Sequence, residues 1–264
     1  MAELTVNGVV LSFDDVGAGS PAFVFVHGFA CDRRAWAPQV ADLSRDHRCI
    51  SVDLRGRGQS AAVPPFDVVT AADDVATIIR ELGVGPAVVV GHSLGGVVAL
   101  LLNERHPELV LGTVIGDSPV SPTRAERSGP GLPERIREAG SMEPAARMVE
   151  RFFHEQTPPR VRAYGEVLMS CPPEVAAGML DGFEPVAMRF KDLVQLADRK
   201  PFMAIWSEAP LGDPAWLRDV TMFVRQEPIA GTGHFFQLEQ PAITNALLRA
   251  FLDDIARDPR VSGN

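Results

Sequence analysis

The chain has 264 residues, of which 46% are apolar, and its 25 basic and 34 acidic side chains give a net charge of −9. This length is enough for one large domain or two modest ones, and the apolar share argues against global disorder. A net negative charge repels nucleic-acid phosphates and anionic membrane surfaces, so we expect neither as a partner.

The N-terminal region has no signal-peptide pattern, and no apolar run reaches the length of a membrane-spanning helix. The three cysteines, Cys31, Cys49 and Cys171, are odd in number and spaced unlike a disulfide framework or a metal site. We therefore expect a cytoplasmic protein without a metal or another cofactor. The sequence leaves the oligomeric state open, a homo-oligomer included.

The first predicted elements are strands. Residues 4–17 read as a hairpin with Asn7-Gly8 as its turn. Six short apolar runs follow, at 22–29, 48–58, 86–93, 112–119, 201–208 and 222–231. Strands without alternating polar residues are typical of a sheet that is buried on both faces.

Helical patterns separate these strands. We predict helices over 71–82, 94–105 and 241–256, because their apolar residues recur at helical spacing between Gly and Pro boundaries. Strands that alternate with helices predict a mostly parallel α/β sheet with right-handed crossovers.

The segment 119–200 breaks this alternation. It shows no convincing strand, and aromatic and Met side chains recur in it at helical spacing. We interpret it as a helical cap inserted into a core formed by residues 1–118 and 201–264.

The stretch Gly91-His92-Ser93-Leu94-Gly95 fits a nucleophile elbow. A predicted strand precedes it and a predicted helix follows it, which is the context that a G-x-S-x-G motif requires. The two glycines leave room for the strand and helix to approach, and the helix N-terminus favours negative charge beside Ser93. We predict Ser93 as the nucleophile and expect His92 to pack beside the elbow.

With this motif, the chain resembles the α/β-hydrolase fold family over nearly its whole length. The stretches VHGF at 26–29, DLRGRGQS at 53–60, GHSLGG at 91–96 and GTGHF at 231–235 occur in the order and spacing of that family. The resemblance implies a Ser–acid–His triad, a backbone oxyanion hole and a cap over the pocket. By the family pattern, the amides of Phe29 and Leu94 form the oxyanion hole.

His234 is the predicted base. It lies after the last strand and before the last helix, on a loop that can reach over the edge of the sheet. We expect His27 to brace the oxyanion loop by hydrogen bonds. Arg33 and Arg34 are expected to be solvated, and Asp53 to brace its loop through Arg55 or Arg57.

The acid has three candidates. Asp213 and Glu208 lie after the strand at 201–208, where the family usually carries its aspartate, but Pro210 occupies the usual place. Asp117 ends the preceding strand, and the carboxyl ends of adjacent parallel strands converge on one edge. Lactonases similar to the zearalenone hydrolases, and the cofactor-free dioxygenases of this fold, use an acid at that strand. We predict Asp117 and keep the other two as alternatives.

The predicted activity is hydrolysis of a small hydrophobic carboxylic ester or lactone through an acyl-enzyme. Trp206, Phe153, Met169 and Phe235 are the predicted substrate-binding residues, because Met and aromatic side chains adapt to apolar ligands. A cofactor-independent dioxygenase and a ligand receptor with residual hydrolase activity are the alternatives. Haloalkane dehalogenases and epoxide hydrolases are disfavoured, because the related enzymes carry aspartate where this chain has Ser93.

Overall fold

The computed structural model describes residues 1–122 and 131–261. Residues 123–130, which belong to the predicted insertion, and residues 262–264 lie outside the described residues. In the part of the chain described, no helix is both long enough and apolar enough to cross a membrane.

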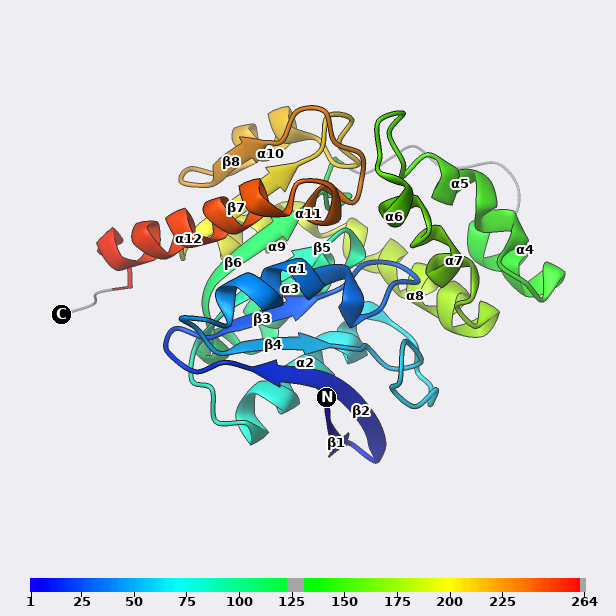
Figure 1. Cartoon of the computed structure of the whole chain (residues 1–264), viewed down its shortest axis with the longest axis horizontal. Helices are drawn as coiled ribbons and strands as arrows, with labels where there is room; N and C mark the ends of the chain where they lie inside the picture. The colour runs from blue at the N-terminus through cyan, green and yellow to red at the C-terminus, as the bar shows by residue number, and fades with distance from the viewer. Residues whose placement is uncertain (123–130, 262–264) are drawn as a thin grey trace.

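A single eight-stranded sheet runs through the molecule (Figure 1). Its order is β1-β2-β4-β3-β5-β6-β7-β8; β1, β2 and β4 pair antiparallel, and all pairs from β4 to β8 are parallel. The strands are β1 (Ala2–Val6), β2 (Val9–Val16), β3 (Phe23–Val26), β4 (Cys49–Val52), β5 (Ala87–His92), β6 (Val110–Gly116), β7 (Phe202–Trp206) and β8 (Arg225–Pro228). The predicted α/β class and mostly parallel sheet are therefore confirmed.

The turn of the N-terminal hairpin has the backbone conformation that its sequence predicts. Asn7 and Gly8 both have positive φ, 49° and 79°, as a two-residue turn between twisted strands requires. Few residues other than Asn and Gly adopt this conformation at low cost.

Both faces of the sheet are buried. Val24 and Val26 of β3 belong to one apolar core, and Phe23 and Phe25 belong to the other. Successive side chains of a strand point to opposite faces, so a strand that is covered on both sides must be apolar throughout.

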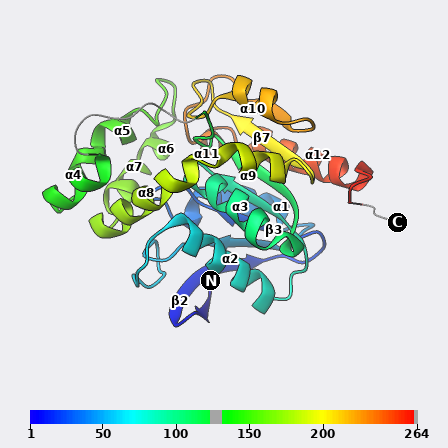
Figure 2. The ribbon, with the colours of Figure 1, turned by 180° about the vertical axis from the view of Figure 1, so that it is seen from behind.

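Helices cover the two faces. On one face lie α1 (Ala37–Leu43) and α12 (Pro241–Arg257), which contact each other (Figure 1). On the other face lie α2 (Val68–Glu81), α3 (Leu94–Arg105) and α9 (Phe190–Ala197), which are nearer the viewer in Figure 2. The ends of α3 agree with the prediction, whereas α2 begins three residues earlier than predicted, because Asp67 caps it by accepting a hydrogen bond from Thr70 N.

Between β6 and β7 the described residues form helices and no strand. They are α4 (Leu132–Ala139), η3 (Glu143–Ala145), α5 (Ala146–Glu150), α6 (Pro159–Arg162), α7 (Gly165–Met169), α8 (Pro173–Ala187) and then α9. The helices α4 to α8 lie together at one side of the sheet (Figures 1 and 2). Pro159 and Pro173 occupy the first position of α6 and α8, where a missing N–H costs nothing, whereas Pro185 lies inside α8.

The other short helices of the described chain lie in the connections between the elements named so far. These are η1 (Arg33–Trp36) after β3, η2 (Pro107–Leu109) before β6, α10 (Pro214–Val220) after β7 and α11 (Phe236–Glu239) before α12. The loops after β3, β5, β6, β7 and β8 carry the predicted site residues, so the parallel half of the sheet positions the site.

Candidate active site

Ser93 occupies a strained turn between β5 and α3. Its φ and ψ are 54° and −122°, and α3 begins at the next residue. A Cβ atom at Gly91 would lie 2.1 Å from the carbonyl oxygen of Gly95, and one at Gly95 would lie 2.3 Å from that of Val26. The two glycines are therefore needed for the elbow to form at all.

Two neighbouring loops hold the elbow. The Ser93 N–H donates to the carbonyl oxygen of Gly116 at 2.7 Å, which ties Ser93 to the residue before Asp117. On the other side, a Cβ atom on Gly28 would lie 2.9 Å from Ser93 Cβ. The loop after β3 thus passes directly against the serine.

His234 and Asp117 form a buried pair. His234 Nδ1 lies 2.6 Å from Asp117 Oδ2. Ser93 and His234 are each 5% exposed, and Asp117 is fully buried. A carboxylate at Nδ1 holds the Nδ1–H tautomer and leaves Nε2 free to accept a proton.

The second carboxylate oxygen of Asp117 faces the loop after β7. Oδ1 accepts from the backbone N–H of Leu211 at 3.3 Å and, more weakly, from that of Ser207 at 3.5 Å. The Asp117 N–H donates to Ile205 O of β7 at 2.7 Å, and Asp117 has a φ of 44°. The neighbouring strand therefore fixes both the backbone and the carboxylate of Asp117.

The other two acid candidates bond elsewhere. Asp213 caps α10, its Oδ1 accepting from Trp216 N at 2.9 Å. Glu208 is exposed, and its Oε2 accepts from Gly231 N at 2.7 Å. Of the three candidate acids, the structure brings Asp117 alone to His234.

Backbone hydrogen bonds from two directions fix the loop that carries His234. Its N–H donates to Phe152 O at 2.8 Å, and its carbonyl oxygen accepts from His92 Nε2 at 2.7 Å. Gly233 N–H donates to Glu239 Oε2 at 3.1 Å. The ring of His234 also packs against the rings of His92 and Phe152, with centroids 4.4 and 4.3 Å away.

His92 is a structural neighbour of the base, as predicted. Because a carbonyl oxygen only accepts, Nε2 of His92 carries the hydrogen. Burial, and then the nearby His234, lower the pKa of His92 well below its usual value. His92 therefore stays neutral near pH 7 and steadies His234 without adding charge.

The predicted oxyanion amides lie at the ends of two ordered segments. Within the described residues, the N–H groups of Phe29 and Leu94 donate to no protein acceptor. His27 braces the loop: its Nδ1 lies 2.9 Å from Gly28 O, and its Nε2 accepts from Leu54 N at 3.1 Å. Burial, followed by the charge of Arg57, lowers the pKa of His27 to about 4, so this brace is neutral near pH 7.

The alpha/beta hydrolase family model matches residues 23–247. The chain belongs to the alpha/beta hydrolase family. The expected resemblance is thereby confirmed over most of the chain.

Solved structures and curated relatives agree with this membership. An esterase from Thermogutta terrifontis, solved with malate bound, is 26% identical with a TM-score of 0.82, covering 96% of this chain and 98% of its own. Est816, described as an N-acyl homoserine lactone degrading enzyme, is 26% identical with a TM-score of 0.76, covering 95% and 100%. Bifunctional epoxide hydrolase 2 of Sus scrofa is 25% identical over 96% of this chain and 55% of its own length. The chain spans 40% to 63% of the length of three such curated relatives.

Two predictions about the loops are wrong. Asp53 bonds neither Arg55 nor Arg57; its carboxylate accepts from the guanidinium and backbone N–H of Arg33 and from Gln59 N. Arg33 is therefore paired and largely buried, whereas it was expected to be solvated. Asp74 is the partner of Arg55. The loop after β4 consists of turns, in which residues two and four apart need not face one another.

The four predicted substrate-binding residues have different surroundings. Phe235 is completely buried, with its ring beside those of His92, His234, Phe152, Phe153 and Tyr164. Trp206 is 3% exposed, and its Nε1 donates to Gln226 at 2.7 Å. Phe153 and Met169, both from the helical segment, are half-buried. Substrate contact by any of the four stays a prediction.

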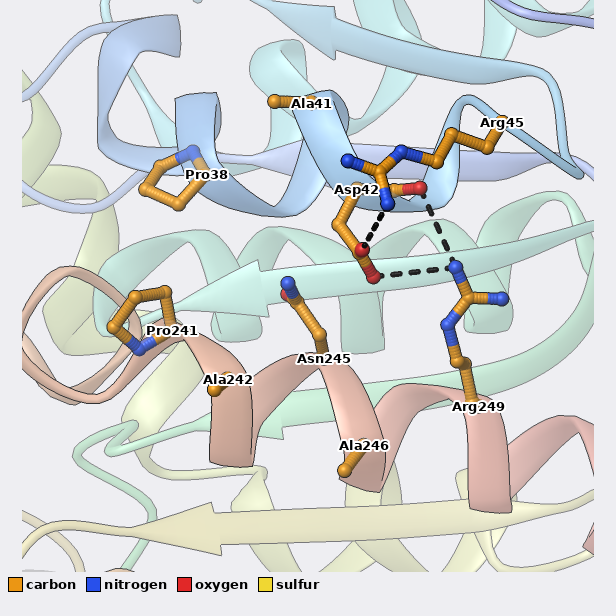
Figure 3. A pocket seen from close by; sticks show the side chains of 9 residues that line it. All are labelled: Pro38, Ala41, Asp42, Arg45, Pro241, Ala242, Asn245, Ala246 and Arg249. Atoms are coloured by element: carbon orange, nitrogen blue, oxygen red, sulfur yellow. Dashed lines mark hydrogen bonds and ion pairs between the residues drawn. The ribbon is translucent and has the colours of Figure 1, made fainter.

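A groove of about 550 Å³ between α1 and α12 holds none of the predicted site residues (Figure 3). Pro38, Ala41, Pro241, Ala242 and Ala246 form its apolar wall. Asp42 forms ion pairs with Arg45 at 3.6 Å and Arg249 at 3.2 Å (Figure 3). Because these charges are satisfied by one another, the groove is not the active-site candidate.

Sequence reasoning missed two contributors to the site. Glu239 and the carbonyl group of Phe152 hold the His234 loop. Glu239 follows His234 by five residues, a spacing that does not distinguish it from an exposed glutamate. Phe152 contributes through its backbone, for which side-chain identity gives no signal.

Proposed function

We propose that this protein is a serine hydrolase that cleaves a carboxylic ester or lactone through an acyl-enzyme. The observation that carries the proposal is the 2.6 Å contact of His234 Nδ1 with Asp117 Oδ2 beside the elbow of Ser93. A serine alone is a weak nucleophile and needs a base whose tautomer is held by an acid.

In the proposed reaction, His234 Nε2 takes the hydroxyl proton as Ser93 Oγ attacks the ester carbonyl carbon. Asp117 stabilises the imidazolium, and the amides of Phe29 and Leu94 donate to the oxyanion. The imidazolium then protonates the departing alcohol as the C–O bond breaks. Water attacks the acyl-enzyme with the same base, which releases the acid and restores Ser93.

The choice of substrate class rests on chemistry and on likeness. A lactone is an internal ester, so the same attack opens it. Likeness to an esterase and to a lactone-degrading enzyme, both at 26% identity, supports this class. The chain is also similar to an epoxide hydrolase. Ser93 argues against that activity here, because we expect epoxide hydrolysis to need a carboxylate nucleophile. In this proposal the helices between β6 and β7 form a cap, and Phe153 and Met169 line the apolar side of the pocket, with Trp206 and Phe235 behind them.

A fluorophosphonate probe, followed by mass spectrometry, tests the nucleophile. We expect the probe to label Ser93 in the wild type and to leave Ser93→Ala unlabelled. An ester, lactone and epoxide panel then tests the class. Hydrolysis of epoxides by Ser93→Ala, or oxygen uptake with a heteroaromatic substrate in place of ester hydrolysis, would contradict the proposal.

A further inference from the structure

A cavity of about 360 Å³ lies between three segments of the hydrolase. Residues 30–34 of the loop after β3 form one wall, residues 56–62 of the loop after β4 form the second, and residues 167–172 of the helical segment form the third. Arg57 lines this cavity and is 3% exposed.

The guanidinium of Arg57 is only partly satisfied. Its Nη1 donates to Arg55 O at 3.0 Å. Within the described residues, Nε and Nη2 have no hydrogen-bond partner. A buried cationic donor without a partner is costly, which makes it a signal that something else satisfies it.

Arg55 shows what these two atoms can bind. Its Nε and Nη2 donate to the two carboxylate oxygens of Asp74, both at 2.7 Å. The same pair of nitrogens on Arg57 forms the same fork, which matches a carboxylate in geometry and charge. Within the described residues, one arginine of this motif has a carboxylate partner and the other has none.

No neighbouring group of the described chain neutralises Arg57. Burial raises the pKa of the Cys31 and Cys171 thiols, so both stay neutral near pH 7. His27, with its pKa lowered to about 4, is neutral as well. The nearby carboxylates are already engaged, Asp53 by Arg33 and Asp32 by Arg34. Burial lowers the pKa of Arg57 itself, which fits a cation without a counter-charge.

The cavity begins next to the proposed reaction centre. Ala30 lines it and directly follows Phe29, and Gly28 lies against Ser93. Three residue steps, from Gly28 to Cys31, span at most about 11 Å. Gly28, which lies against Ser93, is therefore within about 11 Å of Cys31 in the cavity wall, a span that a few carbon atoms of a substrate would cover.

We propose that Arg57 binds a carboxylate group of the substrate, so that the hydrolase prefers esters or lactones that carry a second, ionised acid a few carbons from the reacting carbonyl. This inference rests on the proposed function. It replaces the expectation of a wholly hydrophobic substrate with one that is apolar in its middle and anionic at one end. Both free nitrogens are buried, so the proposal requires the cavity walls to part for the carboxylate.

The test compares two substrates that differ only in charge: mono-(4-nitrophenyl) adipate and its methyl-capped analogue. We expect wild type to hydrolyse the acid with the higher kcat/KM. In Arg57→Met the ratio of the two kcat/KM values should fall about 10- to 100-fold, which is the effect of losing a charge-assisted bidentate contact. Arg57→Lys should retain part of the ratio, because it keeps the charge but not the fork.

Arg218→Met is the matched control. It removes the same charge from the exposed face of α10 and should leave the ratio within about twofold of wild type. Ala62→Trp fills the cavity from an exposed loop position, so it reports on the site even if Arg57→Met fails to fold. It should lower the ratio as well. A ratio unchanged in both Arg57→Met and Ala62→Trp, or no wild-type preference for the acid, would overturn the inference.

A binding experiment separates this inference from the proposed function. Adipate at millimolar concentration should raise the melting temperature of Ser93→Ala, a variant that can be used because this test needs no turnover. Adipate should not raise the melting temperature of the double variant with Ser93→Ala and Arg57→Met. If wild type cleaves no ester but this difference persists, the activity is wrong and the carboxylate site stands. If esters are cleaved and adipate has no effect on either protein, the carboxylate site is wrong.

Discussion

The loops after β6 and β7 lie side by side at one edge of the sheet and contribute in different ways. The β6 loop supplies a carboxylate, Asp117, and bends through a positive φ to present it to His234. The β7 loop supplies backbone: the N–H groups of Ser207 and Leu211 point to the same carboxylate. Its own acids bond elsewhere: Glu208 accepts a hydrogen bond from Gly231 N, and Asp213 caps α10.

This difference teaches that the acid and its support can be divided between neighbouring strands. Parallel strands in register deliver their carboxyl ends to one place, so an acid on either can face the same histidine. What the second loop then adds is backbone N–H donors that hold the carboxylate of Asp117 in place. Position in the chain alone does not identify the acid.

Removal of the proposed nucleophile should have the largest effect and sets the scale for the comparison. We expect Ser93→Ala to lower kcat on a p-nitrophenyl ester by about 10⁶-fold, because the covalent step is lost. The melting temperature should stay close to that of wild type, since the backbone of the elbow is unchanged. Turnover within tenfold of wild type would show that neither loop serves Ser93.

Asp117→Asn tests whether the acid belongs to the β6 loop. This substitution keeps the shape but removes the charge that fixes the tautomer of His234, so kcat should fall by about 10⁴-fold. Glu208→Gln is the control from the β7 loop and should keep kcat within about threefold of wild type. If the two substitutions exchange these outcomes, the acid belongs to β7.

A pH titration extends the comparison to the loop after β3, which His27 braces. The pKa of His27 is lowered from 6.5 to about 4 in the folded chain, so between these values the unfolded chain binds a proton that the folded chain does not. The free energy of unfolding should therefore rise with pH, and about 3 kcal/mol should be lost as the pH falls from 6.5 to 4. Urea unfolding at successive pH values measures this.

The slope of the free energy of unfolding against pH is the quantity that tests this prediction. His27→Gln should make the pH dependence shallower over this window, and the part due to His92, whose pKa burial also lowers, should remain. His154→Gln, from the helical segment, should leave the slope as in wild type. Equal slopes in wild type and His27→Gln would argue that His27 is already protonated in the folded chain.

The smallest expected effect concerns the capping role of Asp213. Asp213→Ala removes the side-chain acceptor for Trp216 N and should cost about 1 kcal/mol of stability. Turnover should stay within about threefold of wild type, because Asp213 does not contact His234. A stability unchanged by Asp213→Ala together with a collapse of kcat would reverse the roles assigned to the two loops.

Local sequence alone determined several features of this protein. Asn7-Gly8 predicts the hairpin, and the glycines around Ser93 predict the elbow, because each depends on the conformations open to a few consecutive residues. The boundaries of α3 follow in the same way from the elbow before it and Pro107 after it.

Only the tertiary structure decided which acid meets His234 and which arginine meets Asp53. Asp117 and His234 are 117 residues apart, and Arg33 and Asp53 are 20 apart. Such contacts depend on the register of neighbouring strands and the paths of the loops between them. The conformational preferences of a few consecutive residues do not encode those positions. The sequence therefore left three candidates for the acid beside His234, and packing selected one of them.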